Sequence, residues 1–169
     1  LGFDKLGAHL LGAGGHLLLR GDGRGRFEEI RCPSLADEPQ LGRGLAASDF
    51  DLDGDVDLAL VNNDGPATLW RNGAADRGGR WLGVELVGED PNSEAIGAVV
   101  TLVSGEHRDR RWIHAGNSYQ SSSDRRLLFG LPSELEGEAT LEVAWPGGRV
   151  TRIAGVAEGA FLRVVEESR

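Results

Sequence analysis

Residues 49–57 have the sequence Asp-Phe-Asp-Leu-Asp-Gly-Asp-Val-Asp, and the interpretation of the whole chain starts from this acidic stretch. Aspartates alternate with other residues, and Gly54 supplies the backbone freedom that a sharp turn needs. This spacing is typical of calcium loops, in which about six to eight oxygens surround the ion at about 2.3–2.6 Å. We expect five metal ligands, namely the side chains of Asp49, Asp51, Asp53 and Asp57 and the backbone carbonyl of Asp55.

Charge repulsion within this loop favours a bound cation. Two carboxylates about 4 Å apart repel each other by about 1 kcal/mol in water, and by several times more where screening is poor. Calcium is the first choice, because magnesium prefers a tighter octahedron and zinc would require Cys or His. The loop differs from an EF-hand, since Leu60 stands at the twelfth position and the flanking residues look like strands. A solvated acidic turn that binds no ion is the alternative.

Glycine content and apolar alternation predict an all-β chain. The 26 glycines and six prolines among 169 residues indicate many tight turns and therefore many short strands. A Gly-Asp-Gly turn in residues 21–25 predicts a hairpin, and the acidic loop is expected to join two further strands. In the first region we expect strands at residues 16–20, 26–30, 44–48, 58–61 and 68–71.

A second region is predicted to form a small β-sandwich or barrel. Its apolar residues alternate along short segments, and Pro-Gly-Gly at 146–148 closes a hairpin between two of them. The expected strands are residues 82–87, 96–103, 110–114, 127–131, 139–145, 149–153 and 161–165. The polar, glycine-rich residues 72–80 look like a linker. We therefore divide the chain into regions 1–75 and 81–166.

Both regions resemble known families. Residues 44–63, which contain the acidic loop, resemble the FG-GAP (VCBS-type) repeat of integrin-like β-propellers. The second region resembles the ASPIC/UnbV domain of the cartilage acidic protein-like family. Four segments carry that resemblance: Ile96-Gly-Ala-Val-Val-Thr-Leu, His114-Ala-Gly-Asn-Ser-Tyr-Gln-Ser-Ser-Ser-Asp, Leu128-Phe-Gly-Leu and Val143-Ala-Trp-Pro-Gly-Gly-Arg.

These resemblances imply a calcium-binding, non-catalytic binding or scaffold module. Region 1–75 would be one or more blades at the C-terminal end of a propeller, with Ca²⁺ at Asp49, Asp51, Asp53 and Asp57. An extracellular or cell-surface location is implied, with a protein, glycan or small molecule as ligand. Missing N-terminal blades or a separate propeller chain would complete the propeller. The alternative is an enzyme or enzyme-like helper in bacterial natural-product biosynthesis, such as an enediyne pathway, that forms a ring or orients a ligand.

Composition excludes several other roles. A formal net charge of −9 gives the chain no electrostatic reason to bind nucleic acid or an anionic membrane. No apolar run reaches the ~20 residues that span a bilayer. No signal peptide is expected at the start of this sequence, which leaves a cytoplasmic location open. Cys32 is the only cysteine, so no internal disulfide can form.

No residue is assigned a catalytic role. Ser121, Asp124 and His114 supply serine, acid and histidine side chains, but no Gly-x-Ser-x-Gly elbow exposes a nucleophile. A candidate ligand cleft is formed by Asn117, Tyr119, Gln120 and Asp124, although hydrogen bonding within a turn explains these residues equally well. The chain contains four tryptophans, each of which could form part of a carbohydrate-binding surface or pack against other parts of the protein. We favour packing for all four: Trp70, Trp81, Trp112 and Trp145.

Overall fold

The fold is all-β, as predicted. The computed structural model describes residues 8–9, 16–22, 24–32, 41–63, 65–73, 78–131 and 138–167, and it contains strands and no helix within these ranges. No described segment is therefore a helix of the length and apolarity that crossing a membrane requires. Contacts between residues divide the protein into two compact units. The first unit contains Leu1–Phe50, Asp55–Asn72 and Gly116–Ser123. The second unit contains Asp51–Gly54, Gly73–Ala115 and Asp124–Arg169.

The first unit begins with a three-stranded antiparallel sheet in the order β1-β2-β3. Its strands are β1 (Ala8–His9), β2 (Leu17–Gly21) and β3 (Phe27–Ile30). The predicted hairpin is confirmed, since Gly21 pairs with Phe27. Asp22 closes the turn, because its Oδ1 accepts hydrogen bonds from the backbone N–H groups of Arg24 (2.6 Å) and Arg26 (3.2 Å).

A second antiparallel sheet of the first unit carries the acidic loop. It consists of β4 (Leu41–Ser48), β5 (Asp57–Asn63) and β6 (Thr68–Trp70), in that order. Leu58 and Leu60 are buried while Ala59 and Val61 are exposed, the alternation expected of a strand with one covered face. Ser48 is paired with Asp57, so the acidic residues form the connection of a β4–β5 hairpin, as predicted.

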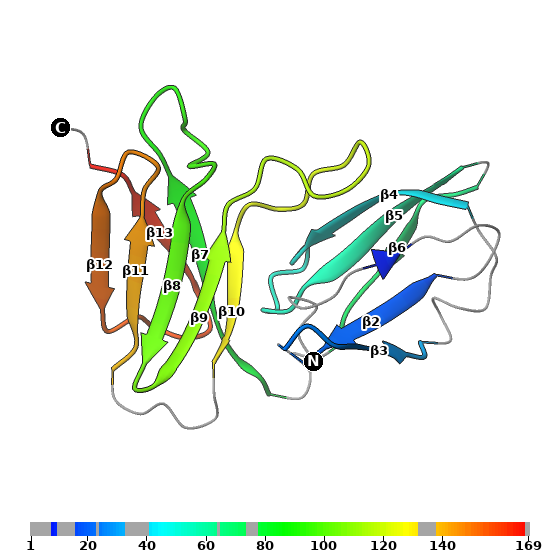
Figure 1. Ribbon diagram of the computed structural model, residues 1–169, viewed down its shortest axis with the longest axis horizontal. Coiled ribbons are helices and arrows are strands. Elements are labelled where there is room, and N and C mark those ends of the chain that lie inside the picture. Colours follow the sequence, from blue (N-terminus) through cyan, green and yellow to red (C-terminus); the bar gives the residue numbers. More distant parts are fainter. Residues whose placement is uncertain are drawn as a thin grey trace. The chain divides into compact units, whose positions relative to one another are not determined.

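The second unit is a β-sandwich rather than a closed barrel. One sheet has the order β10-β7-β13 and the other the order β12-β11-β8-β9, and Figure 1 shows the latter four side by side. The first sheet contains β7 (Arg80–Val87), β10 (Leu127–Leu131) and β13 (Phe161–Val165). The second contains β8 (Val99–Ser104), β9 (His107–Trp112), β11 (Thr140–Ala144) and β12 (Val150–Ala154).

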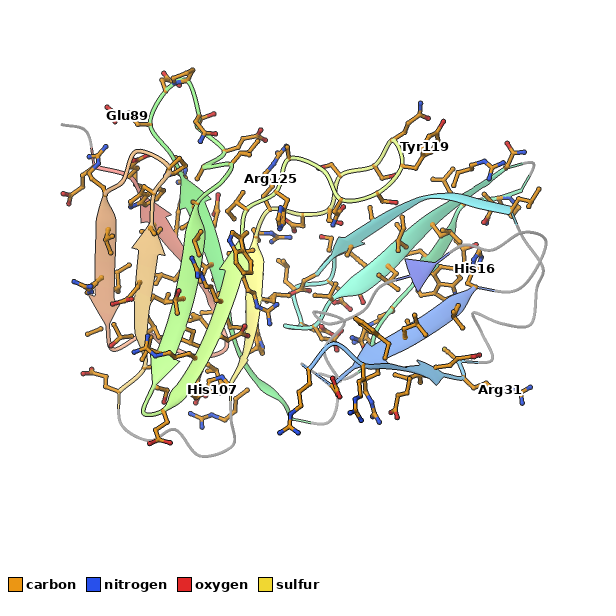
Figure 2. All side chains as sticks on the ribbon, viewed as in Figure 1. His16, Arg31, Glu89, His107, Tyr119 and Arg125 are labelled. Atoms are coloured by element: carbon orange, nitrogen blue, oxygen red, sulfur yellow. The ribbon has the colours of Figure 1, made fainter. Side chains whose placement is uncertain are left out.

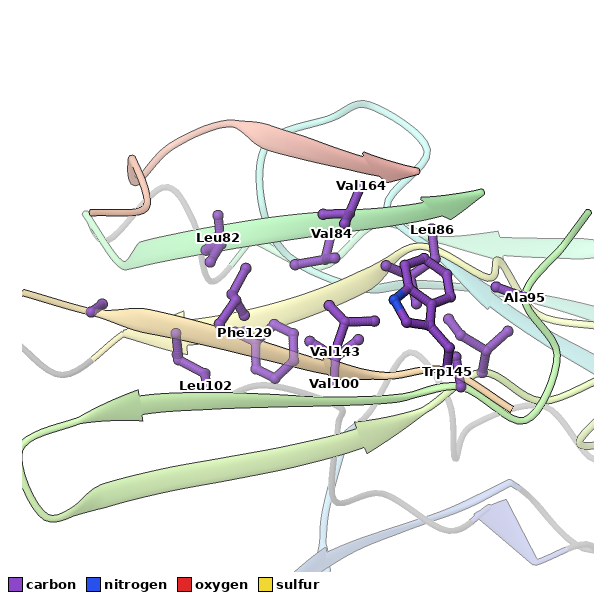
Figure 3. Close-up of a cluster of buried hydrophobic side chains, with 14 residues drawn as sticks. Leu82, Val84, Leu86, Ala95, Val100, Leu102, Phe129, Val143, Trp145 and Val164 are labelled. Carbon is purple, nitrogen blue, oxygen red and sulfur yellow. The ribbon is translucent and has the colours of Figure 1, made fainter. Parts of the chain in front are cut away.

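Alternate residues of the facing strands fill the space between the two sheets. Leu82 and Val84 of β7 pack in one cluster with Val100 and Leu102 of β8, and Figure 3 shows this cluster between the sheets. The cluster also contains Phe129, whose side chain is fully buried. Burial of this apolar surface is the dominant favourable term for the second unit.

Two predicted strands of the second unit are displaced. The strand predicted at 110–114 is observed as β9 at His107–Trp112, and the strand predicted at 96–103 starts later than expected. The apolar run at 96–103 predicts a strand from Ile96, whereas β8 begins at Val99. The side chain of Asn92 explains the difference, since its Nδ2 donates to the Ile96 carbonyl (2.9 Å) and its Oδ1 accepts from the Ile96 N–H (3.0 Å). Gly97 follows with φ +88°, which is outside the strand region. The Asn92 contacts and Gly97 therefore hold a turn where hydrophobicity alone indicates a strand.

Candidate metal centre

Asp57 anchors the acidic loop at the first position of β5. Its side chain is 1% exposed. Its Oδ2 accepts a hydrogen bond from the Phe50 N–H (3.1 Å), and its Oδ1 accepts one from the Asn72 N–H (2.7 Å). Asn72 also donates from Nδ2 to the Val56 carbonyl (3.2 Å). One buried carboxylate thus joins the start of the loop to the residues that follow β6, which fixes the loop's ends.

Three loop carboxylates converge on one point. Asp49, Asp51 and Asp57 each offer an oxygen, and these oxygens lie within 4.8 Å of one another. Asp49 is 3% exposed and Asp51 is exposed. Two carboxylate charges at that separation repel each other by about 1 kcal/mol in water and by about 3–4 kcal/mol at an effective dielectric constant of about 20. A cation among the three oxygens would reverse the sign of this interaction.

The donor set fits a hard divalent cation. All three converging groups are carboxylates, which suit calcium, magnesium or manganese better than zinc or copper. Asp53 is half-buried and Asp55 is buried in the same loop, but neither belongs to the converging group. The converging group thus contains three of the four aspartates predicted to bind the ion through their side chains, and the backbone carbonyl predicted for Asp55 stays a prediction.

Gly54 is required by the loop for two reasons. Its φ of +94° lies in the region that only glycine adopts at low cost, which agrees with its predicted role in the turn. A Cβ at Gly54 would also overlap the indole of Trp81, which itself packs edge-to-face on Phe161 at a centroid distance of 5.4 Å. The positive φ of Gly54 was predictable from the sequence of the turn. The Trp81 contact was not, because it joins residues that are distant in sequence.

Gly54→Ala is therefore expected to destabilise the protein more than Gly25→Ala. Gly25 has a similar φ of +83°, but a Cβ there would meet no atom within 4 Å. A left-handed conformation costs a non-glycine residue about 1–3 kcal/mol, and both variants lose this amount. Only Gly54→Ala must also displace Trp81. Urea denaturation of both variants measures the difference, and equal losses would show that the Trp81 contact is unimportant.

Two of the four candidate cleft residues, Asn117 and Asp124, form side-chain hydrogen bonds within turns. Asn117 donates from Nδ2 to Ser123 Oγ (2.8 Å), and its Oδ1 accepts from the same hydroxyl (3.0 Å). Asp124 accepts from the Arg126 N–H (2.9 Å) and from its guanidinium Nε (2.8 Å). Tyr119 is 64% exposed and points outward in Figure 2, and Gln120 has a φ of +47°.

The same loop covers the edge of β4, a role that we did not predict. Ser118 Oγ accepts a hydrogen bond from the Leu45 N–H (3.3 Å), and Ser123 Oγ accepts one from the Ala47 N–H (3.0 Å). These serines use N–H groups that β4, as an edge strand, would otherwise present for pairing with another strand. Ser118 and the serine run in 121–123 were the sequence signal for this contact.

Comparison with known proteins supports the predicted second region. Residues 88–169 match the family model described as ASPIC and UnbV. The chain is 28% identical over 138 residues to cartilage acidic protein 1 of Mus musculus, covering 79% of this chain and 21% of that protein. It is 34% identical over 148 residues to cartilage acidic protein 1 of Xenopus tropicalis, covering 83% of this chain and 22% of that protein. Both matches are longer than the family domain, and the chain spans about a fifth of the length of these curated relatives.

Proposed function

We propose that this chain is a calcium-binding, non-catalytic binding or scaffold module. The observation that carries the proposal is the convergence of Asp49, Asp51 and Asp57 in one loop, with Asp49 and Asp57 almost completely buried. Three converging carboxylate charges repel one another, and the repulsion is stronger where burial reduces screening. Calcium supplies a compensating positive charge and accepts an all-oxygen, irregular ligand set.

The ion would act on the hairpin that holds it. Calcium needs about six to eight oxygens, and both oxygens of Asp57 already accept backbone hydrogen bonds. Each of these oxygens keeps a second lone pair for the ion, and we propose that the Asp53 carboxylate, the Asp55 carbonyl and water complete the shell that Asp49, Asp51 and Asp57 begin. Binding would stabilise the folded loop by RT ln(1 + [Ca²⁺]/Kd), which is about 2.7 kcal/mol at a hundredfold excess over Kd.

The first region would be part of a propeller. An Asp-rich calcium loop between two strands is the arrangement that the FG-GAP (VCBS-type) resemblance implies, and the β4–β5 connection has this form. Both relatives named cartilage acidic protein 1 match beyond the ASPIC and UnbV domain, which supports assigning the two regions to one kind of protein. An extracellular or cell-surface location, and further blades as partners, are part of this proposal.

Asp51→Asn tests the metal centre without disturbing the fold. Asp51 is exposed, so its replacement should leave the apo protein intact, but it removes a charge from the converging group. We expect isothermal titration to show calcium affinity lowered by about tenfold or more, because ligand charge tunes calcium Kd. Glu106→Gln removes one charge from the exposed β8–β9 turn and should leave the affinity unchanged. Equal affinities for the two variants would contradict ligation by Asp51.

A further inference from the structure

The outward face of the four-stranded sheet in the second unit carries an ordered pattern of side chains. Two rows cross its strands. An apolar row contains Trp112, Val99, Ala144 and Val150, which are paired partners on β9, β8, β11 and β12. A charged row contains Arg110, Thr101, Glu142 and Arg152 on the same strands. Because the rows are two residues apart along each strand, they lie about 6.6–6.8 Å apart.

Trp112 differs from the other tryptophans of the chain. Trp145 is buried at 3% exposure, and Trp70 and Trp81 are half-buried against aromatic rings. Trp112 is 46% exposed on the open face of a sheet. The guanidinium carbon of Arg110 lies 5.3 Å from its ring centroid, which places a positive charge against the exposed indole. Packing therefore explains three tryptophans but leaves Trp112 without such an explanation.

The face is positively charged although the chain is acidic. Its outward positions include Arg108, Arg110 and Arg152, with Glu142 as the acid among them. Arg152 binds Glu142 through Nε at 2.7 Å and is 69% exposed. That hydrogen bond lowers the pKa of Glu142, and the charge of Arg108 lowers it further. Since the Debye length is about 8 Å at physiological salt, a nearby ligand senses this local charge rather than the net charge of −9.

We propose that this face binds an acidic polysaccharide, with sugar rings on the apolar row and carboxylate or sulfate groups on the arginines. The exposed indole offers a flat apolar surface to the C–H groups of a pyranose ring, and Arg110 and Arg152 can bind carboxylates bidentately. The small side chains between them leave the face flat enough for a chain laid across the strands. This inference names the ligand class of the binding module proposed above and rests on that role.

Two other polymer classes fit this face less well. Peptides that bind to sheets pair with an edge strand, and the backbone groups of the central strands β8 and β11 are already used in pairing. Nucleic acid is densely charged, with one charge per ~1.7 Å of duplex, whereas this face offers three arginines beside one glutamate. A polysaccharide with widely spaced acidic groups matches that sparse pattern of charges.

Isothermal titration with a hyaluronan oligosaccharide tests the proposal directly. The wild-type chain should bind it, should bind the carboxyl-reduced neutral form less tightly, and should bind a poly-glutamate peptide of equal charge less tightly. Trp112→Ala should weaken binding by about tenfold or more, because both the stacking surface and its arginine contact are lost. Arg110→Gln should weaken binding and make it less dependent on salt concentration.

Matched control variants distinguish binding at this face from the general effect of removing a positive charge or an aromatic ring. Phe27→Ala removes an aromatic side chain that is 61% exposed on β3 of the first unit, and Arg163→Gln removes an arginine that is 65% exposed on β13. Phe27→Ala and Arg163→Gln should both bind hyaluronan like the wild type. Full affinity of Trp112→Ala, equal binding of poly-glutamate, or no binding by the wild type would each overturn the inference. The same titration in EGTA should be unchanged, because the two rows share no residue with the acidic loop.

Discussion

Asp57→Ala is expected to lower the free energy of unfolding in saturating calcium by about 2–6 kcal/mol. Asp57 is 1% exposed and accepts hydrogen bonds from the N–H groups of Phe50 and Asn72. Alanine would leave both donors unsatisfied in the interior, at about 1–3 kcal/mol each. The loss should exceed that of Asp51→Asn, since Asp51 is exposed. Urea denaturation of both variants measures the comparison.

The same variant separates the two roles of Asp57. In EGTA the loss should be smaller, because removing one carboxylate also relieves its repulsion with Asp49 and Asp51. The difference between the calcium and EGTA values then reports the contribution of Asp57 to ion binding. A loss that is the same in both conditions would assign Asp57 to structure alone, and no loss in either would contradict the anchoring role.

Phe129→Ala is expected to destabilise the second unit by about 3–5 kcal/mol. Phe129 is fully buried between the sheets, and truncating such a side chain removes its hydrophobic contribution and leaves a cavity. The guanidinium of Arg111 lies 5.0 Å from the ring centroid and would lose this contact as well. Thermal or urea denaturation monitored by circular dichroism gives the value.

Phe27→Ala is the control for Phe129→Ala. Phe27 is 61% exposed on β3, so the same chemical change should alter stability by no more than about 0.5 kcal/mol. If the two variants unfold at the same urea concentration, the packing assigned to the sandwich is wrong.

Local patterns in the sequence predict most of the strands and the acidic loop. Strands 127–131 and 161–165 have the predicted bounds, because their apolar residues are flanked by turns. The loop between β4 and β5 is likewise visible from Asp spacing and one glycine. These features depend on neighbouring residues, which is the information that a single sequence contains.

Features that depend on distant residues were not predictable. The Gly54–Trp81 contact, the serines that cover β4 and the parallel pairing of β7 with β13 each join segments far apart in the chain. Convergence of three aspartate side chains rather than the predicted four is also a property of the folded loop. Periodicity cannot reveal which side chains of a tight turn point inward.

The four tryptophans also show that local sequence does not reveal which side chains are exposed. All four occur in or beside strands, and packing was the favoured interpretation for each. Packing describes Trp145, but Trp112 occupies an outward position of β9. Its position follows from strand pairing: Trp112 lies opposite Val99, on the face away from the core residue Val100. Register, rather than composition, identifies Trp112 as the tryptophan with an exposed side chain on the outward face of a sheet.

Calcium titration into the EGTA-treated, dialysed wild-type chain tests the metal centre most directly. Isothermal titration should show one saturable site with a preference for Ca²⁺ over Mg²⁺, and the melting temperature should rise by roughly 5–10 °C at a hundredfold excess over Kd. The absence of binding heat, together with a melting temperature that is the same in calcium and in EGTA, would contradict the assignment of Asp49, Asp51 and Asp57 to a calcium site.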